Sequence, residues 1–189
     1  FAPALCNRID RNTGGIVIAA KTAEALRVIN EKIKQGEIDK RYLCAVHGIL
    51  PKKQDTLRGY LKKDSATNMV SVFEKKTTNS REVKEIITEY TVLDEAKDLS
   101  LCEVHLITGR THQIRAHFSS IGHPLLGDGK YGINRDDRHS GYKYQALYSY
   151  KLTFAFKTPS PLDYLCGKTV EVDRSHIWFL REFSKKTDG

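Results

Sequence analysis

An acidic side chain stands between two basic ones near the start of the sequence, where Arg8 and Arg11 flank Asp10. Nearby positive charge favours the ionised form of a carboxyl group and lowers its pKa. An aspartate held ionised in this way can act as a nucleophile or as a base. The alternative is a structural role, in which Asp10 caps a turn and pairs with Arg8 or Arg11 at the surface. Taken alone, this motif leaves both interpretations open.

The residues after Asp10 predict the element that positions it. The turn formers of residues 12–15 are followed by the apolar run Ile16-Val17-Ile18-Ala19-Ala20, which is typical of a buried strand. Asp10 is therefore expected on a loop at the end of a rigid element. Such loops are where enzymes commonly carry their reacting groups.

A second dense motif, Thr-Gly-Arg-Thr-His-Gln-Ile-Arg-Ala-His, covers residues 108–117. Its pattern predicts a helix that begins near Thr111 and ends at Gly122. Arg115 lies one turn into this helix, and its planar guanidinium suits a bidentate pair with a carboxylate. Asp10 is the candidate partner. The apolar positions that the helix would bury are Ile114, Phe118 and Ile121.

Two cations and an aromatic ring, Lys40, Arg41 and Tyr42, open another predicted strand. The cations could hold phosphate while the ring stacks on a base turned out of a nucleic acid. For Tyr42 alone, packing in the core is the favoured interpretation. Arg8 could fill the gap that such a base leaves, or it could simply pair with Asp10.

Four histidines near the second motif invite a metal-binding interpretation, but their spacings of seven, five and six do not match a helical zinc site. No nearby acidic ligand completes one, so we expect no metal. The glycines form neither a dinucleotide-binding nor a Walker pattern, so no nucleotide cofactor is expected. Hydrogen bonds to backbone, loop or phosphate are the favoured role of these side chains, which are His105, His112, His117 and His123.

Composition bounds the class of protein. The chain has 189 residues, 40% of them hydrophobic, which suits one compact domain. It has neither an apolar stretch long enough to span a membrane nor a secretory signal, so we expect a cytoplasmic protein that acts as a monomer. The cysteines are widely spaced and form no CxxC pair, so free and partly buried thiols are expected for Cys6, Cys44, Cys102 and Cys166.

The net charge of +8 is concentrated in the segments that carry the motifs. Residues 1–63 contain 13 Lys and Arg against 6 Asp and Glu, and residues 105–157 contain 8 against 3. We expect the two segments to form one basic face around a cleft, for which a phosphate backbone is the obvious partner. The alternative is a solvated basic surface without a specific partner.

The remaining pattern predicts an α+β domain. A helix is expected over residues 23–35, with Thr22 as its N-cap and Gly36 as its stop. Strands are expected over 42–49, 82–93, 99–107 and 148–156, and the last should have one buried and one wet face. Because strands follow one another without intervening helices, the pairing should be mostly antiparallel. Segments 50–81 and 122–146 are interpreted as long functional or mobile loops.

The sequence resembles the RluA-type RNA pseudouridine synthases. The resemblance rests on the motifs at residues 8–15, 40–43 and 108–115, together with Gly122-His123-Pro124-Leu125-Leu126-Gly127-Asp128 and Tyr131-Gly132. It spans residues 5 to about 157 in the family's order and spacing. It implies the family's catalytic fold, a mostly antiparallel mixed sheet with flanking helices and a basic cleft.

The resemblance also implies an activity: isomerisation of specific uridines to pseudouridine in structured RNA, with ribosomal RNA of the large subunit favoured over tRNA and no metal or organic cofactor. By matching position, Asp10 is similar to the catalytic aspartate, Tyr42 to the ring that packs on the target base, and Arg115 to the ion-pair partner of the aspartate. Arg8 corresponds to the basic residue that helps to displace the base. The other residues expected to contact RNA are Arg11, Lys40, Arg110 and His112.

The sequence departs from the family pattern at three places. Asn7 stands where the family usually has His, Gly14 stands where it usually has Ser, and residues 145–148 lack the usual Leu-His-Ala pattern. Family members also carry strands before the catalytic motif and often an S4-like domain. We therefore expect residues 1–189 to be a single catalytic domain that lacks these preceding parts.

Two other classes of function remain as alternatives. One is a non-catalytic RNA-binding or ribosome-assembly protein that keeps the fold and the basic face. The other is an RNA glycosidase or nuclease, although a glycosidase would normally need a second carboxylate, which neither motif obviously supplies. Whether Asp10 attacks C1′ or removes the 2′ proton is not decided by the residues.

Overall fold

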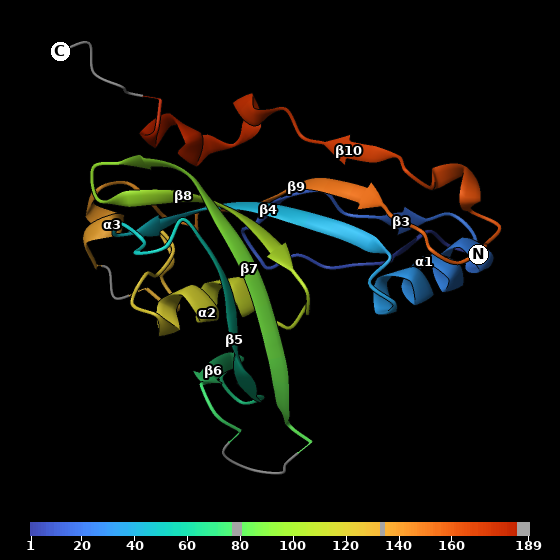
Figure 1. Ribbon diagram of the computed structural model, residues 1–189, viewed down its shortest axis with the longest axis horizontal. Helices are drawn as coiled ribbons and strands as arrows, with labels where there is room; N and C mark the ends of the chain where they lie inside the picture. The colour runs from blue at the N-terminus through green and yellow to red at the C-terminus, as the bar shows by residue number, and fades with distance from the viewer. Residues whose placement is uncertain (77–80, 133–134, 185–189) are drawn as a thin grey trace.

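The computed structural model describes residues 1–76, 81–132 and 135–184, and in this part of the chain an eight-stranded sheet forms the body of the protein (Figure 1). Seven strands pair antiparallel along one path, and β2 (Gly14–Gly15) adds to β9 in parallel. The prediction of a mostly antiparallel mixed sheet is confirmed. The strands of the path, in order, are β10 (Thr169–Glu171), β9 (Leu147–Phe154), β4 (Ile38–His47), β8 (Leu99–Leu106), β7 (Val83–Ala96), β5 (Gln54–Asp64) and β6 (Met69–Phe73).

The helices largely follow their sequence signals. Helix α1 (Ala23–Lys34) begins where the hydroxyl of Thr22 accepts a hydrogen bond from the N–H of Ala25 at 3.1 Å, as predicted. It ends before Gly36, because a φ of +69° is left-handed and cannot continue a right-handed helix. The other helices are α2 (Gln113–Ser120) and the short α3 (Arg135–His139); 3₁₀ turns follow at η1 (Asp163–Leu165), η2 (Arg174–His176) and η3 (Trp178–Glu182).

Both faces of the sheet are covered, because α2 and the C-terminal segment lie on opposite sides of β4 and β8 (Figure 1). Alternate residues of β4 therefore enter two different cores. Tyr42 and Cys44 pack with Phe118 of α2, whereas Leu43 packs with Phe179 of η3. Strand β4 is the central element on which the rest of the fold is placed.

Strands β5 and β6 and one end of β7 project from the body as an arm (Figure 1). A small apolar cluster joins the arm to α2, since Leu61, Val70 and Ile86 pack against Ala116. The prediction of a long loop over residues 50–81 is wrong for the described part of that segment, because β5 and β6 lie within it. The segment is rich in charged residues because the arm is surrounded by solvent, and it still forms regular strands.

The apolar run of residues 16–20 does not form the continuous buried strand predicted for it. Only Ala19–Ala20 is a strand, β3, which pairs with β1 (Ala4–Leu5). Ile16 and Ile18 pack against the core while Val17 is exposed. The run is an extended segment with one buried side. Its apolar residues pack against the core, although only part of the run has a neighbouring strand.

Two smaller predictions also need correction. Ile121 is not buried by α2 but follows it, with 40% of its surface exposed, although Gly122 does end the turn with a φ of +82°. In β9, Ser149 was expected on a wet face yet is buried, because it stands opposite Tyr42 on the face of the sheet that α2 covers. The four cysteines are free, but the prediction that they are partly buried fits only Cys6, since Cys44 and Cys102 are buried and Cys166 is exposed.

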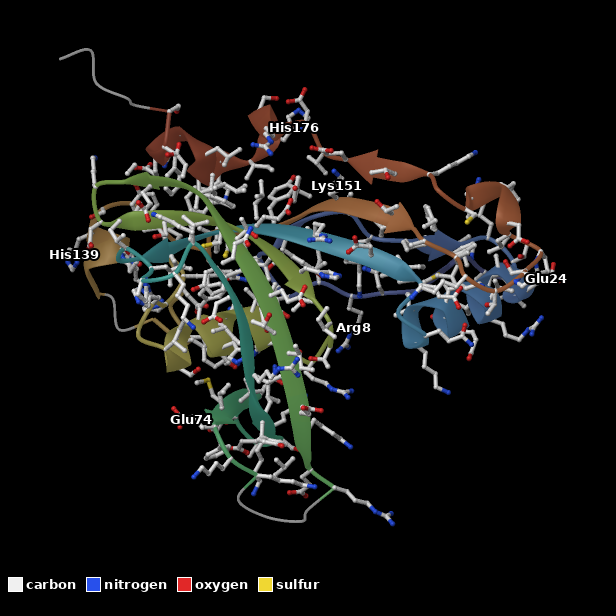
Figure 2. All side chains as sticks on the ribbon, in the orientation of Figure 1. Arg8, Glu24, Glu74, His139, Lys151 and His176 are labelled. Carbon is white, nitrogen blue, oxygen red and sulfur yellow. The ribbon has the colours of Figure 1, made fainter. Side chains whose placement is uncertain are left out.

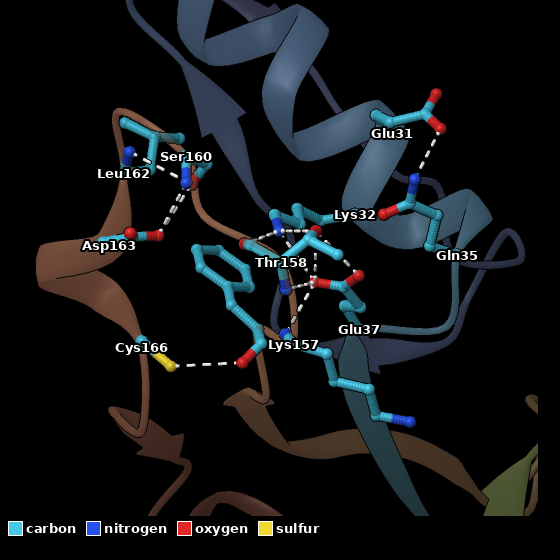
Figure 3. A network of polar contacts seen from close by, with 11 residues as sticks. Glu31, Lys32, Gln35, Glu37, Lys157, Thr158, Ser160, Leu162, Asp163 and Cys166 are labelled. Atoms are coloured by element: carbon cyan, nitrogen blue, oxygen red, sulfur yellow. Dashed lines mark hydrogen bonds and ion pairs between the residues drawn. The ribbon is translucent and has the colours of Figure 1, made fainter.

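A closed polar network joins α1 to the segment after β9 (Figure 3). The ammonium group of Lys32 donates to Glu37 at 2.7 Å and to the carbonyl and hydroxyl oxygens of Thr158 at 2.5 and 2.7 Å. Glu37 also accepts from the N–H of Lys157 at 2.8 Å. These bonds hold the pKa of Glu37 down at about 2.

Within the described ranges, no helix combines the length and the apolar character needed to cross a membrane.

Candidate active site

Asp10 lies on a tight turn at the edge of the sheet. Its carbonyl accepts a hydrogen bond from the N–H of Thr13 at 3.0 Å, and Asn12 adopts a φ of +67° that Asn tolerates better than most residues. The amide of Gln145 donates to the carbonyl of Arg11 at 2.6 Å and to the hydroxyl of Thr13 at 3.1 Å. The turn is therefore fixed at both ends to the residues that precede β9.

The unusual residues beside Asp10 have structural explanations. The side-chain oxygen of Asn7 accepts from the N–H of Ile18 at 2.8 Å, which closes the base of the loop. A Cβ atom at Gly14 would lie 2.3 Å from the ring of Tyr148. The departure at position 14 and the one at Tyr148 are thus linked. A Ser at position 14 would collide with the ring of Tyr148.

Asp10 and Arg115 come together as predicted. The Nη1 atom of Arg115 lies 3.5 Å from Oδ2 of Asp10, and their side chains are 7% and 21% exposed. Asp10 forms its ion pair with Arg115, although Arg8 and Arg11 are near it in sequence. The alternative, a surface ion pair of Asp10 with Arg8 or Arg11, is therefore not the one that the structure contains.

Arg115 has a second and closer acidic partner, Asp128, which the sequence motifs contained without a role. Nε and Nη2 of Arg115 donate to the two oxygens of Asp128 at 2.7 and 2.9 Å. Burial disfavours both charges, but their mutual contact outweighs it, so the pKa of Asp128 is lowered and that of Arg115 is raised. The N–H groups of Lys130 and Tyr131 also donate to Asp128, at 2.9 and 3.0 Å.

Tyr131 is the other contributor to the site that the sequence did not assign. Its ring lies against the guanidinium of Arg115, 5.1 Å from centroid to Cζ. Its hydroxyl accepts from the N–H of Val70 at 3.1 Å and lies 2.7 Å from Nδ1 of His112. The only sequence signal for Asp128 and Tyr131 was their place in a dense turn motif, because contacts across a loop leave no periodic pattern.

Tyr42 lies both in the core and at the hollow. It is 7% exposed and belongs to the core, yet its ring also lines the hollow beside Asp10. The pairing of β4 with β9 changes register between Arg41 and Tyr42, so that Tyr150 of β9 is the extra residue of a bulge. Bulges redirect side chains beside functional sites. Burial, reinforced by Asp10, raises the pKa of Tyr42.

A hollow opens beside Asp10, with about 470 Å³ of space including the open solvent at its mouth. A wider groove, of about 1340 Å³ on the same measure, adjoins it and reaches Lys63 and Asn68 at the arm. Asp10 is the one acidic residue among the described residues that line either space. The cations that line them are Arg8, Arg11, Lys40, Lys63 and Arg110, so the expected basic cleft is present.

The predicted contact residues occupy different parts of this cleft. Arg8, Lys40, Arg110 and His112 line both spaces, while Arg11 lines only the outer groove. Arg8 extends from the body into the region between β4 and the arm (Figure 2). Burial lowers the pKa of Lys40, which marks it as a cation partly withdrawn from water.

Of the four histidines singled out in the sequence, only His112 reaches the cleft. His105 bridges Asp39 and Glu89 on the sheet, and His123 lies 2.8 Å from the carbonyl of His47. His117 is buried beside Thr88 at 2.8 Å, and burial lowers its pKa to about 4. Hydrogen bonding within the protein therefore accounts for three of the four.

The fold and the cleft together define a class of protein: a domain with a basic groove that leads to a single carboxylate held by a buried arginine. The sequence pattern of the family described as RNA pseudouridylate synthase matches residues 1–120. The chain belongs to this family.

Curated relatives and solved structures agree with that placement. An uncharacterized RNA pseudouridine synthase of Mycoplasma genitalium is 36% identical over 95% of this chain and 56% of its own length. Ribosomal large subunit pseudouridine synthase D of Zymomonas mobilis is 32% identical over 90% of this chain and 52% of its own length. The chain thus spans about half the length of these relatives.

The fold is that of human RNA pseudouridylate synthase domain containing 4, with a TM-score of 0.76 at 20% identity over 95% of this chain and 75% of that one. Human RNA pseudouridylate synthase domain containing 1 matches with a TM-score of 0.71 at 22% identity, over 100% of this chain and 82% of that one. The predicted fold class is confirmed.

Proposed function

We propose that this protein isomerises uridine to pseudouridine in structured RNA, with Asp10 as the catalytic carboxylate. The observation that carries the proposal is a single acid in a basic cleft, held by an arginine whose other side is locked on Asp128. A surface built only to bind phosphate gains nothing from a carboxylate among its cations, because like charge there repels the ligand.

The chemistry assigned to Asp10 follows from the bond that must break. Cleavage of the C1′–N1 bond gives the ribose oxocarbenium character, which an ionised carboxylate can stabilise or trap. Nη1 of Arg115 lies 3.5 Å from Oδ2 of Asp10. This contact orients the carboxylate and leaves its other oxygen available. The two routes from there, attack on C1′ or removal of the 2′ proton, both use the same placement of Asp10.

The remaining assigned residues would bring the uridine to Asp10. Turning a base out of a stack costs a few kcal/mol. Arg8 and Arg110 at the mouth, with Lys40 deeper in the hollow, would compensate by holding the phosphates on either side. Tyr42 would pack on the uracil while it rotates to present C5. Arg11 and His112 complete the contacts that we assign to RNA.

Two alternatives predict different behaviour. An RNA glycosidase would use a second carboxylate, but Asp128 is fully buried and spends both oxygens on Arg115 and on backbone N–H groups. That leaves it without a proton to give to a leaving group. A non-catalytic RNA-binding protein would need Arg110 and Lys40 but not Asp10.

Large-subunit ribosomal RNA is the substrate that we favour. Two relatives are named for that RNA, the synthase D of Zymomonas mobilis and a ribosomal large subunit pseudouridine synthase C of Buchnera aphidicola. Transfer RNA is the second candidate. The basic groove of this chain is compatible with either, since its cations contact phosphate and carry no sequence information by themselves.

Pseudouridine maps of ribosomal and transfer RNA test the proposal. We would compare cells with the full-length gene, without it, and with Asp10→Asn or Glu24→Gln, the last an exposed residue of α1 (Figure 2). At least one site should vanish without the gene and with Asp10→Asn, and persist with Glu24→Gln. Persistence of every site with Asp10→Asn would rule the proposal out. Loss of function with Arg110→Glu but not with Asp10→Asn would favour a non-catalytic RNA-binding protein. Release of free uracil from the RNA would favour an RNA glycosidase.

A further inference from the structure

His112 is held in a backbone conformation that few non-glycine residues adopt. Its φ of +54° and ψ of +20° place it in the left-handed region immediately before α2. Strained backbone conformations of this kind cluster at active sites and at ligand-binding loops. Here it sets His112 at the wall shared by the hollow and the groove, in the same space as Asp10 and Tyr42.

One nitrogen of His112 is anchored and the other is left for a ligand. Nδ1 lies 2.7 Å from the hydroxyl of Tyr131, and the two rings meet edge to face with centroids 5.5 Å apart. Nε2 has no hydrogen-bond partner among the described residues. The phenol oxygen of Tyr131 has two lone pairs, of which the N–H of Val70 uses one at 3.1 Å. With the proton on Nδ1, the other lone pair accepts it, and Nε2 of this cleft-lining residue then carries the lone pair of the ring.

The surroundings favour the neutral form of this imidazole. Burial lowers the pKa of His112, and Arg115 and Lys130 lower it further, while Asp10 and Asp128 act in the opposite direction. A neutral imidazole can accept a proton. The anchor on the Tyr131 oxygen serves the neutral base and the cation equally well, so accepting a proton requires no rearrangement.

The isomerisation proposed above needs such a base at a late step. When C1′–N1 breaks, the electron pair goes to N1; the uracil then turns, and C5 bonds to C1′ while N1 and C6 become doubly bonded. C5 now carries both the sugar and its original hydrogen. Loss of that proton forms the C5–C6 double bond and returns a pair to N1, which takes a proton. One proton moves from C5 to N1 overall, and no other reagent is consumed.

Resting on the proposed function, we infer that His112 is a further catalytic residue, whose Nε2 removes the proton from C5 and can return it to N1. In the proposed reaction Asp10 acts on the sugar, and the phenol of Tyr42 stays protonated because burial raises its pKa. His112 is therefore the base that the cleft offers at the uracil.

Replacing the hydrogen at C5 isolates this step. The full-length His112→Gln variant would be assayed on the RNA in which the wild type forms pseudouridine, transcribed with ordinary, 5-deuterated or 5-fluorinated uridine. Loss of a positioned base typically slows a reaction 10²–10⁴-fold, so we expect a fall of about a hundredfold with uridine. We also expect a new discrimination against deuterium. The 5-fluoro substrate has no C5 proton to lose, so its rearrangement should keep nearly the wild-type rate.

Equal slowing on uridine and 5-fluorouridine RNA, or a uridine rate within about twofold of wild type, would overturn the inference; equal slowing would indicate that His112 only binds or positions. The matched control is His176→Gln, an exposed residue of η2 on the opposite side of the sheet (Figure 2), which should change nothing. If His112→Gln fails to fold, Tyr131→Phe keeps the ring on Arg115 but removes the anchor, and it should show the same isotope discrimination with a smaller loss. A wild type that makes no pseudouridine would refute the proposed function before this question arises.

Discussion

Two buried ion pairs in this molecule are built in opposite ways. The pair of Lys32 and Glu37 is closed: each side chain is 4% exposed, and all three ammonium protons have partners (Figure 3). The pair of Arg115 and Asp128 is just as dry, at 7% and 0%, but it is open on one side. The third nitrogen of Arg115 points to Asp10, which is 21% exposed and lines the cleft.

The difference shows how one kind of interaction can serve two purposes. A closed pair offsets the cost of burying its charges entirely within the protein, and what it achieves is the attachment of one segment to another. An open pair fixes the guanidinium with one carboxylate and presents the remaining donor to a second one. We therefore expect damage to the closed pair to appear in stability and damage to the open pair to appear in chemistry.

The largest effect is expected from Asp128→Ala, because it destroys the buried half of the open pair. The guanidinium of Arg115 would stay buried without its bidentate partner, and breaking such a pair typically costs about 3–5 kcal/mol. Urea unfolding should show a loss of this size, and pseudouridine formation should fall with it because Arg115 is no longer fixed.

Asp128→Asn is the matched control for that change. It keeps the shape and the acceptor for the N–H groups of Lys130 and Tyr131, so its stability loss should be smaller. A loss under about 1 kcal/mol for Asp128→Ala would mean that the pair contributes little to holding Arg115.

A smaller and purely structural effect is expected from Glu37→Gln in the closed pair. Contacts with Lys32 and Lys157 lower the pKa of Glu37 from its ordinary 4.5 to about 2. The unfolded chain therefore takes up this proton first as pH falls. The stability that Glu37 contributes is complete above pH 4.5 and is lost as pH falls toward 2.

Acid unfolding of wild type and Glu37→Gln checks this prediction. The wild type should lose stability more steeply than the variant below pH 4.5, while the two have equal rates on RNA at neutral pH. Parallel curves would show that the network does not hold the segment after β9. A reduced rate for the folded variant would show that the closed pair is not confined to structure.

A pH-dependent effect of comparable size, in a higher pH window, is expected from His117→Asn on α2. Burial lowers the pKa of His117 from 6.5 to about 4, so the unfolded chain binds the proton first. This group removes stability as pH falls from 6.5 to 4 and adds no slope below that range. The variant should lose the slope in that window alone. An unchanged slope between pH 6.5 and 4 would contradict the burial of a neutral imidazole.

The open pair was partly readable in the sequence and the closed pair was not. Asp10, Tyr42 and Arg115 stand in motifs whose residue types suggest chemistry, and their convergence followed from the family's spacing. Asp128 could not be assigned, since its contact with Arg115 crosses a loop of irregular structure. The Lys32–Glu37 contact likewise depends on Thr158, more than a hundred residues away.

The elements show the same division. Alternation and capping residues predicted α1 and most of the strands, because those signals are local. The bulge in β9, the burial of Ser149 and the extended run at residues 16–18 depend on which segments lie alongside. Local patterns do not contain that information.

Arg115→Lys tests the central claim most directly, because it keeps the charge and removes only the geometry. Lysine cannot hold both oxygens of Asp128 and still direct a donor to Asp10. The measurement is the rate of pseudouridine formation by the full-length protein at saturating RNA, with the free energy of unfolding measured on the same sample.

We predict that the rate falls about a hundredfold, as expected for a misplacement of about 1 Å at a reacting group, while the variant remains folded at the assay temperature. A folded Arg115→Lys variant with a rate within about twofold of wild type would contradict the account, since the open pair would then have no part in the chemistry.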